Sequence, residues 1–74
     1  MQIFGFIDNT RSTSDKIINR WGIPAQTKGL ARRQAKINAR IKHGQSAEVL
    51  NVDEGGEGSL PGQTIYFVET RVDR

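Results

Sequence analysis

The chain of 74 residues contains no cysteine and a single histidine. Without cysteine, neither a disulfide nor a cysteine-ligated zinc site can form, which fits a reducing compartment. No apolar run approaches the ~20 residues that cross a bilayer. The first ten residues, MQIFGFIDNT, also lack the basic region and long apolar run of a signal peptide. We therefore expect a cytoplasmic protein with no membrane partner.

Residues suited to catalysis or metal binding are scarce. His43 stands at the end of a predicted helix, where an imidazole more often serves as a helix-terminus cation than as a base. The serines occur without a recognisable nucleophile motif. Asp53, Glu54 and Glu57 lack the regular ligand spacing of a calcium loop. We expect no enzymatic activity, no catalytic residue, no cofactor and no metal site.

Acidic residues are absent from residues 16–47, although this stretch has eight basic ones. The acids gather afterwards, at Glu48, Asp53, Glu54 and Glu57. Like charges four residues apart on a helix cost roughly 0.2–0.5 kcal/mol per pair, so a helix kept only for solubility usually mixes signs. The uneven charge indicates nucleic acid or an acidic protein surface as partner. A merely solvated helix face is the alternative. The basic residues are Lys16, Arg20, Lys28, Arg32, Arg33, Lys36, Arg40 and Lys42.

The segment from Thr27 to His43 has the clearest helical period in the chain. Thr27 is suited to cap its start, and Gly44 is suited to end it. One face is apolar enough to pack on a sheet, and another is uniformly basic. Small residues would also let the helix lie close to a neighbour. The apolar face holds Leu30, Gln34, Ile37 and Ile41; the basic face holds Arg32, Lys36 and Arg40, with Arg33 alongside; the small residues are Ala31, Ala35 and Ala39.

Strand-forming residues gather in four segments, two before this helix and two after it. The first two are residues 2–8 and 16–26, with a polar turn at 9–15. The last two are residues 47–52 and 64–71, with a flexible acidic, glycine-rich loop at 53–63 between them and a fraying end at 72–74. Ser14 to Trp21 could instead form a short helix, which would make a helix–turn–helix with the main one. The strand is favoured because Ile17, Ile18 and Trp21 suit a pleated surface.

This order of elements, ββαββ, predicts an α+β fold in one domain spanning residues 1–74. One helix would pack on a four-stranded antiparallel sheet in two layers. We expect Leu30, Ile37 and Ile41 to cover one sheet face, including Trp21, Ile65 and Phe67. The other face has no element left to cover it. An exposed apolar sheet face is usually an interface, so a homodimer through it is one interpretation.

The leading hypothesis for function is a small basic protein that binds nucleic acid, DNA or RNA, through phosphate contacts of its helix. Aromatic side chains would add stacking. The acidic loop could instead fold over the helix and screen its charge. The residues expected to contact phosphate are Arg32, Arg33, Lys36 and Arg40, helped by Lys28, Lys42 and Arg20; the candidates for stacking or for an exposed sheet face are Trp21, Phe4, Phe6 and Tyr66.

Residues 23–27 (IPAQT) lead from a predicted strand into ARRQAK at residues 31–36, and a hairpin follows. In size and in this order of elements the chain resembles small proteins of phages and other mobile elements, including some type I anti-CRISPR proteins. The resemblance implies a protein that occupies a partner's surface. The alternative function is therefore binding that inhibits or regulates a host protein, through the sheet face or the basic helix. No functional residue is carried over from this resemblance.

Overall fold

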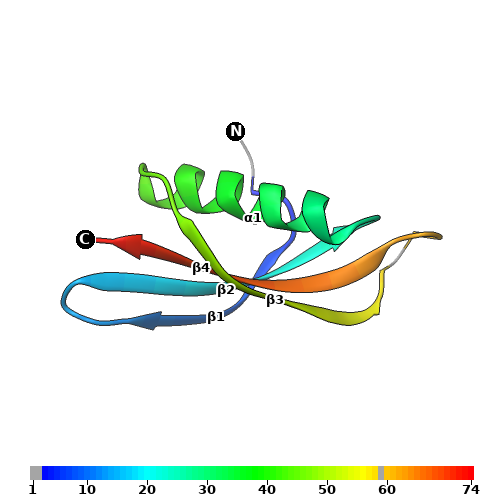
Figure 1. Cartoon of the computed structure of the whole chain (residues 1–74), viewed down its shortest axis with the longest axis horizontal. Coiled ribbons are helices and arrows are strands. Elements are labelled where there is room, and N and C mark those ends of the chain that lie inside the picture. The colour runs from blue at the N-terminus through cyan, green and yellow to red at the C-terminus, as the bar shows by residue number, and fades with distance from the viewer. Residues whose placement is uncertain (1–2, 59) are drawn as a thin grey trace.

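The computed structural model describes residues 3–58 and 60–74. One helix lies across one face of a four-stranded antiparallel sheet, so the predicted two-layer α+β fold is confirmed (Figure 1). The strand order in the sheet is β1-β2-β4-β3. The elements are β1 (Phe6–Ser12), β2 (Lys16–Ala25), α1 (Lys28–His43), β3 (Glu48–Glu57) and β4 (Thr64–Asp73).

The helix connects two parallel strands that are not neighbours. β2 and β3 each pair antiparallel with β4, which lies between them. Parallel strands need a long crossover, and α1 supplies it on one face of the sheet. β1 pairs with β2 as a hairpin, with the Thr13 N–H donating to the Lys16 carbonyl at 2.9 Å. Since residues 16–21 belong to β2, the alternative of a helix–turn–helix is wrong.

Both predicted ends of α1 are confirmed. The Thr27 hydroxyl accepts a hydrogen bond from the Leu30 N–H at 3.2 Å, as an N-cap residue does. Gly44 adopts a left-handed conformation with φ of 73°, and its N–H donates to the Arg40 carbonyl. Glycine pays no steric penalty for that conformation, so the helix ends there.

The face of α1 that packs on the sheet is not the expected one. Ala31, Ala35, Asn38 and Ala39 are buried. Leu30 and Ile37, by contrast, are 51% and 40% exposed, so the prediction that they cover the sheet is wrong, while Ile41 is half-buried. The sheet itself supplies the large side chains of the core, so only small residues fit beneath the helix. These sheet residues are Trp21, Ile23, Tyr66, Val68 and Val72. Ile65 and Phe67 alternate with Tyr66 and Val68 along β4 and therefore belong to the other sheet face.

Three strand boundaries also differ from the sequence prediction. β1 was expected over residues 2–8, of which Gln2 lies outside the described residues; it runs instead from Phe6 to Ser12. β3 continues to Glu57, through half of the segment expected to be a loop. β4 continues to Asp73, with Val72 only 1% exposed, so the expected fraying from residue 72 is wrong.

Candidate nucleic-acid interface

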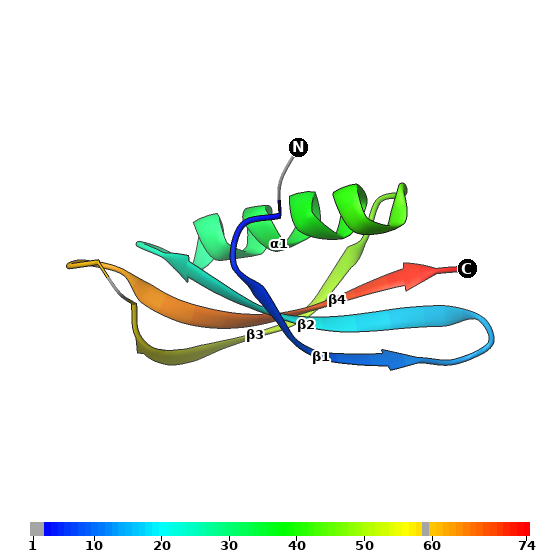
Figure 2. The same ribbon diagram turned by 180° about the vertical axis from the view of Figure 1, so that it is seen from behind.

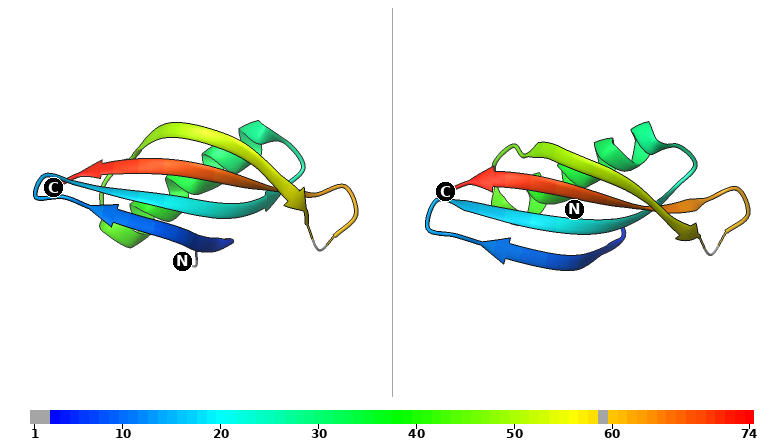
Figure 3. Two further views of the ribbon diagram at one scale, coloured as in Figure 1. Left: turned by 90° about the horizontal axis from the view of Figure 1, so that it is seen from below. Right: turned by 60° about the horizontal axis from the view of Figure 1, so that its bottom comes forward.

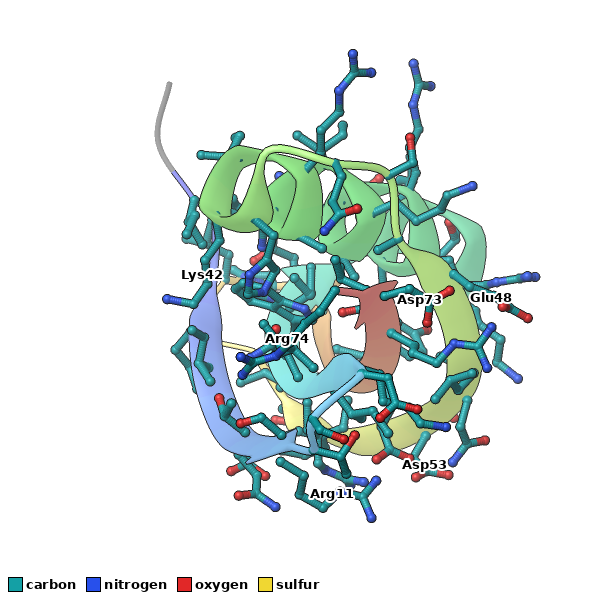
Figure 4. All side chains as sticks on the ribbon, turned by 90° about the vertical axis from the view of Figure 1, so that its left-hand side faces the viewer. Arg11, Lys42, Glu48, Asp53, Asp73 and Arg74 are labelled. Atoms are coloured by element: carbon teal, nitrogen blue, oxygen red, sulfur yellow. The ribbon has the colours of Figure 1, made fainter. Side chains whose placement is uncertain are left out.

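The outer side of α1 is uniformly basic. Helical spacing places Arg33, Lys36 and Arg40 on the side away from the buried alanines, with Lys28 and Arg32 on the flank beside β3. All five side chains are exposed, and α1 contains no acidic residue. Nitrogen-tipped side chains project from this side of the helix, away from the sheet (Figure 4). We call these five residues the outer helix face.

Within the part of the chain that the structure describes, the outer helix face has no acidic partner. Among residues 3–58 and 60–74, no ion pair involves a residue of α1. Lys42 is exposed at the C-terminal end of the helix and is likewise outside those pairs. Five of the six predicted phosphate-contacting residues of the helix therefore lie together, with their charges unpaired within the described part of the chain. Lys42 lies apart from them, on the sheet side of the helix end (Figure 4).

No helix covers the sheet face opposite α1 within the described residues, as the view from below shows (Figure 3). This face is also charged, but its arginines are paired. We call it the open sheet face. Arg11 binds Glu69 at 2.8 Å. Arg71 binds Glu48 and, at 3.5 Å, Asp73. The Arg11–Glu69 bridge reaches from β1 across β2 to β4, Arg71–Glu48 joins the adjacent strands β4 and β3, and Arg71–Asp73 lies within β4. Positive and negative groups therefore alternate across the sheet.

Arg20 belongs to the open sheet face, not to the helix side. Its guanidinium lies 3.4 Å from Asp8 and 3.5 Å from Asp53, and 4.8 Å from the centre of the Phe67 ring. Arg20 therefore does not join the other predicted phosphate contacts. Asp53 is held on this face as well, and none of the described ion pairs links Glu54 or Glu57 to α1.

Two of the four predicted aromatic contacts are inside the protein. Trp21 is fully buried, and its indole N–H donates to the Thr70 hydroxyl at 2.8 Å. Tyr66 is 9% exposed in the core beneath the helix. Neither ring offers a face to a nucleobase, so these two predictions are wrong. The other prediction for Trp21, that it lies on the sheet face covered by the helix, is confirmed, since Trp21 packs in one core with the alanines of α1.

Phe4 and Phe6 are both about half exposed, but they lie on opposite sides of the molecule. The Phe6 ring covers Gly22 on the open sheet face, where a Cβ would come within 2.2 Å of the ring. It meets Phe67 edge to face, with 6.5 Å between the ring centres. Phe4 instead lies beside α1, because the chain rises from the start of β1 toward the helix (Figure 2).

Asn38 holds Phe4 in that position. Its side-chain amide donates to the Phe4 carbonyl at 2.7 Å, and its side-chain oxygen accepts from the Phe4 N–H at 3.1 Å. Gln34 donates to the same oxygen at 2.9 Å. Gly5 makes the path possible: its φ is 98°, and a Cβ there would lie 2.3 Å from the Gly22 carbonyl oxygen. This contact was not predicted, although Asn38, a polar residue within the apolar pattern of the helix, indicated a polar partner at that position.

An open groove of about 450 Å³ is lined by Phe4, by α1 and by the end of β2. No acidic residue lines it. We call it the Phe4 groove. Its walls combine apolar side chains, three carboxamides and one cation, and consist of Phe4, Ile23, Pro24, Ala25, Gln26, Leu30, Arg33, Gln34, Ile37 and Gln63.

His43 fastens the C-terminal end of α1 to β2. Its Nε2–H donates to the side-chain oxygen of the buried Asn19 at 2.7 Å, and the Asn19 amide donates to the Thr10 hydroxyl at 2.9 Å. Burial lowers the pKa of His43, and the charge of Lys42 lowers it further. The neutral imidazole is therefore favoured, whereas the sequence predicted a helix-terminus cation.

Within the described residues, no cluster of three or more histidine, aspartate or glutamate side chains is arranged to hold a metal ion. No helix in this part of the chain has the length and apolar character needed to span a membrane. No family model, curated protein or solved structure matches the chain. A function must therefore be argued from the geometry of its own residues.

Proposed function

We propose that this chain is a nucleic-acid-binding module whose outer helix face contacts phosphates. One observation supports the proposal above the others. The cations of the outer helix face have no acidic partner among the described residues, whereas Arg11, Arg20 and Arg71 of the open sheet face each have one or two. Both surfaces are rich in arginine, but only one offers its charge to a polyanion.

The electrostatics of α1 favour such a partner. Arg32, Lys36 and Arg40 follow one another at intervals of four residues, where like charges repel by roughly 0.2–0.5 kcal/mol per pair. A phosphate backbone relieves this repulsion, and binding releases counterions condensed on the nucleic acid. Contacts to phosphate orient a protein on its target but do not read sequence. The proposed activity is therefore binding without strong sequence preference.

Titration of labelled single- and double-stranded DNA and RNA at low and moderate salt tests this proposal. Arg33→Glu/Arg40→Glu should bind at least ~60-fold more weakly near 0.1 M salt, because each lost phosphate contact costs about eightfold there. The matched control, Arg11→Glu/Arg71→Glu, makes the same change in net charge on the open sheet face. Its affinity for nucleic acid should fall only a few-fold. Circular dichroism checks that both variants are folded.

Two results would contradict the proposal. One is equal loss of affinity in the helix and sheet variants, which would mean that net charge alone controls binding. The other is the absence of binding to any of the four nucleic acids at low salt.

The alternative is a protein-interaction module, such as a phage or mobile-element protein that inhibits or regulates a host protein. The observation that favours it is the exposed Phe6, which packs edge to face on the half-buried Phe67 on the open sheet face, where the surrounding charges are already paired. An aromatic anchor of this kind usually dominates an interface. Phe6→Ala should then abolish binding of the partner, or of a second copy, without unfolding the domain.

A further inference from the structure

We propose that the Phe4 groove holds an unpaired nucleobase of a single-stranded nucleic acid whose phosphates lie along the outer helix face. This inference rests on the proposed function and specifies its ligand. Arg33 belongs both to the outer helix face and to the lining of the groove. A strand bound along the helix would therefore have its bases within reach of the groove.

The Phe4 ring provides a stacking surface on an anchored backbone. Phe4 is 49% exposed, while its backbone is held by both hydrogen-bonding groups of the fully buried Asn38. Leu30 and Ile37 form the facing apolar wall and are also exposed. A base stacked on an aromatic side chain typically binds about five- to 150-fold more tightly than one without that ring. An exposed ring on an anchored backbone loses little freedom when a base stacks on it.

Carboxamides provide polar contacts at the edge of the same groove. Gln26 and Gln63 line it, and their side chains make no hydrogen bond within residues 3–58 and 60–74. A carboxamide offers both donors and acceptors, as the edges of nucleobases do. The groove therefore combines an apolar stacking surface with groups that can pair with a base edge, and Arg33 at its side suits the adjoining phosphate.

The charges around the Phe4 groove suit a nucleic-acid strand better than the charges around Phe6, the other exposed ring. Phe6 is as exposed as Phe4, but Arg11 and Arg20 on its sheet face are already paired with Glu69, Asp8 and Asp53, so they leave no unpaired cation there for a phosphate. No acid lines the Phe4 groove. A base in a duplex is already stacked on both faces and paired along one edge, so only an unpaired base can enter the groove. The volume of about 450 Å³ lies within the range of small-ligand pockets.

Fluorescence anisotropy with a short labelled oligothymidine, and with an abasic strand of equal length, tests the inference. Both strands carry the same phosphates, so only the bases differ. Phe4→Leu should weaken binding of oligothymidine at least fivefold and leave the abasic strand unaffected, whereas Phe4→Trp should retain full binding. Phe6→Leu is the matched control on the opposite face and should change neither. Leucine preserves apolar volume, and thermal melting checks that each variant is folded.

The outcomes separate this inference from the proposed function. If Arg33→Glu/Arg40→Glu abolishes binding but Phe4→Leu has no effect on oligothymidine, phosphate binding stands and the base site is overturned. An equal effect of Phe4→Leu on both strands would also overturn it. If neither strand binds at low salt, the inference is overturned, and if duplex DNA and RNA also fail to bind, the proposed function fails with it. Capture of an acidic peptide by the groove in place of either strand would assign it to a protein partner and overturn the inference.

Discussion

The outer helix face and the open sheet face differ less in the number of their charges than in what those charges contact. On the sheet, cross-strand charged neighbours have opposite signs, and the arginines form ion pairs at 2.8–3.5 Å with acids of the same strand, of the adjacent strand or of the strand beyond it. On the helix, neighbours one turn apart have the same sign. Basic residues counted along a sequence do not identify a binding surface until their partners are known.

The largest expected effect comes from removing the Asn38 side chain, which holds Phe4 beside α1. Asn38→Ala removes two hydrogen bonds to Phe4 and one from Gln34 at a fully buried position. We expect the free energy of unfolding to fall by about 3 kcal/mol, because three part-buried hydrogen bonds are lost at roughly 1 kcal/mol each. Urea denaturation measures it, and Asn51→Ala, at an exposed site, should change it by less than ~0.5 kcal/mol. A loss below 1 kcal/mol for Asn38→Ala would show that the contact does not hold the N-terminal segment.

Reversing one charge on each face should change the stability of the protein in opposite directions. Lys36→Glu converts repulsion from Arg32 and Arg40 into attraction and should stabilise the free protein by about 1 kcal/mol, while weakening its binding to nucleic acid. Arg20→Glu places a third carboxylate beside Asp8 and Asp53 and should destabilise it by about 1 kcal/mol.

Urea denaturation at low and high salt measures both reversals, and both effects should shrink as salt is added. A loss of stability in Lys36→Glu would mean that the helix cations have acidic partners after all.

The smallest expected effect is the dependence of stability on pH, and it comes from His43, which joins α1 to the sheet. Burial holds the pKa of His43 below its value in the unfolded chain, so the unfolded state binds more protons as the pH falls through that value, about 6.5. Stability should therefore decrease on acidification from pH 7 and level off below the folded-state pKa. Thermal melting of the protein and of His43→Asn across this range measures the difference. An equal decrease in His43→Asn would assign it to other groups.

Much of the fold was predictable because its signals are local. The Thr27 cap, the Gly44 terminus and the four strand segments depend on residues within a few positions of each other. β1 was misplaced because all seven of its residues are exposed, so an edge strand of this kind lacks the alternation that marks a half-buried one. β3 was cut short because Gly55 looks like a loop residue, although it lies in the strand against the Phe67 ring.

The candidate site was predictable only where it depends on one element. The basic residues of α1 share a helix, so their spacing in sequence was enough to group them. Arg20, Trp21 and Tyr66 were misassigned because their surroundings come from partners distant in sequence, namely Asp53, Thr70 and the alanines of α1. The expected packing of Leu30 and Ile37 failed for the same reason, since the size of the sheet side chains decides which helix face fits.

The salt dependence of binding tests the central claim, that the helix cations and not the sheet cations contact phosphate. On duplex DNA, the logarithm of the binding constant should fall with the logarithm of salt concentration at a slope of about −4 to −5, as expected for four to six contacts. Arg33→Gln should reduce the magnitude of this slope by about 1, and Arg11→Gln should leave it unchanged. A slope near zero, or an equal reduction in both variants, would contradict the claim.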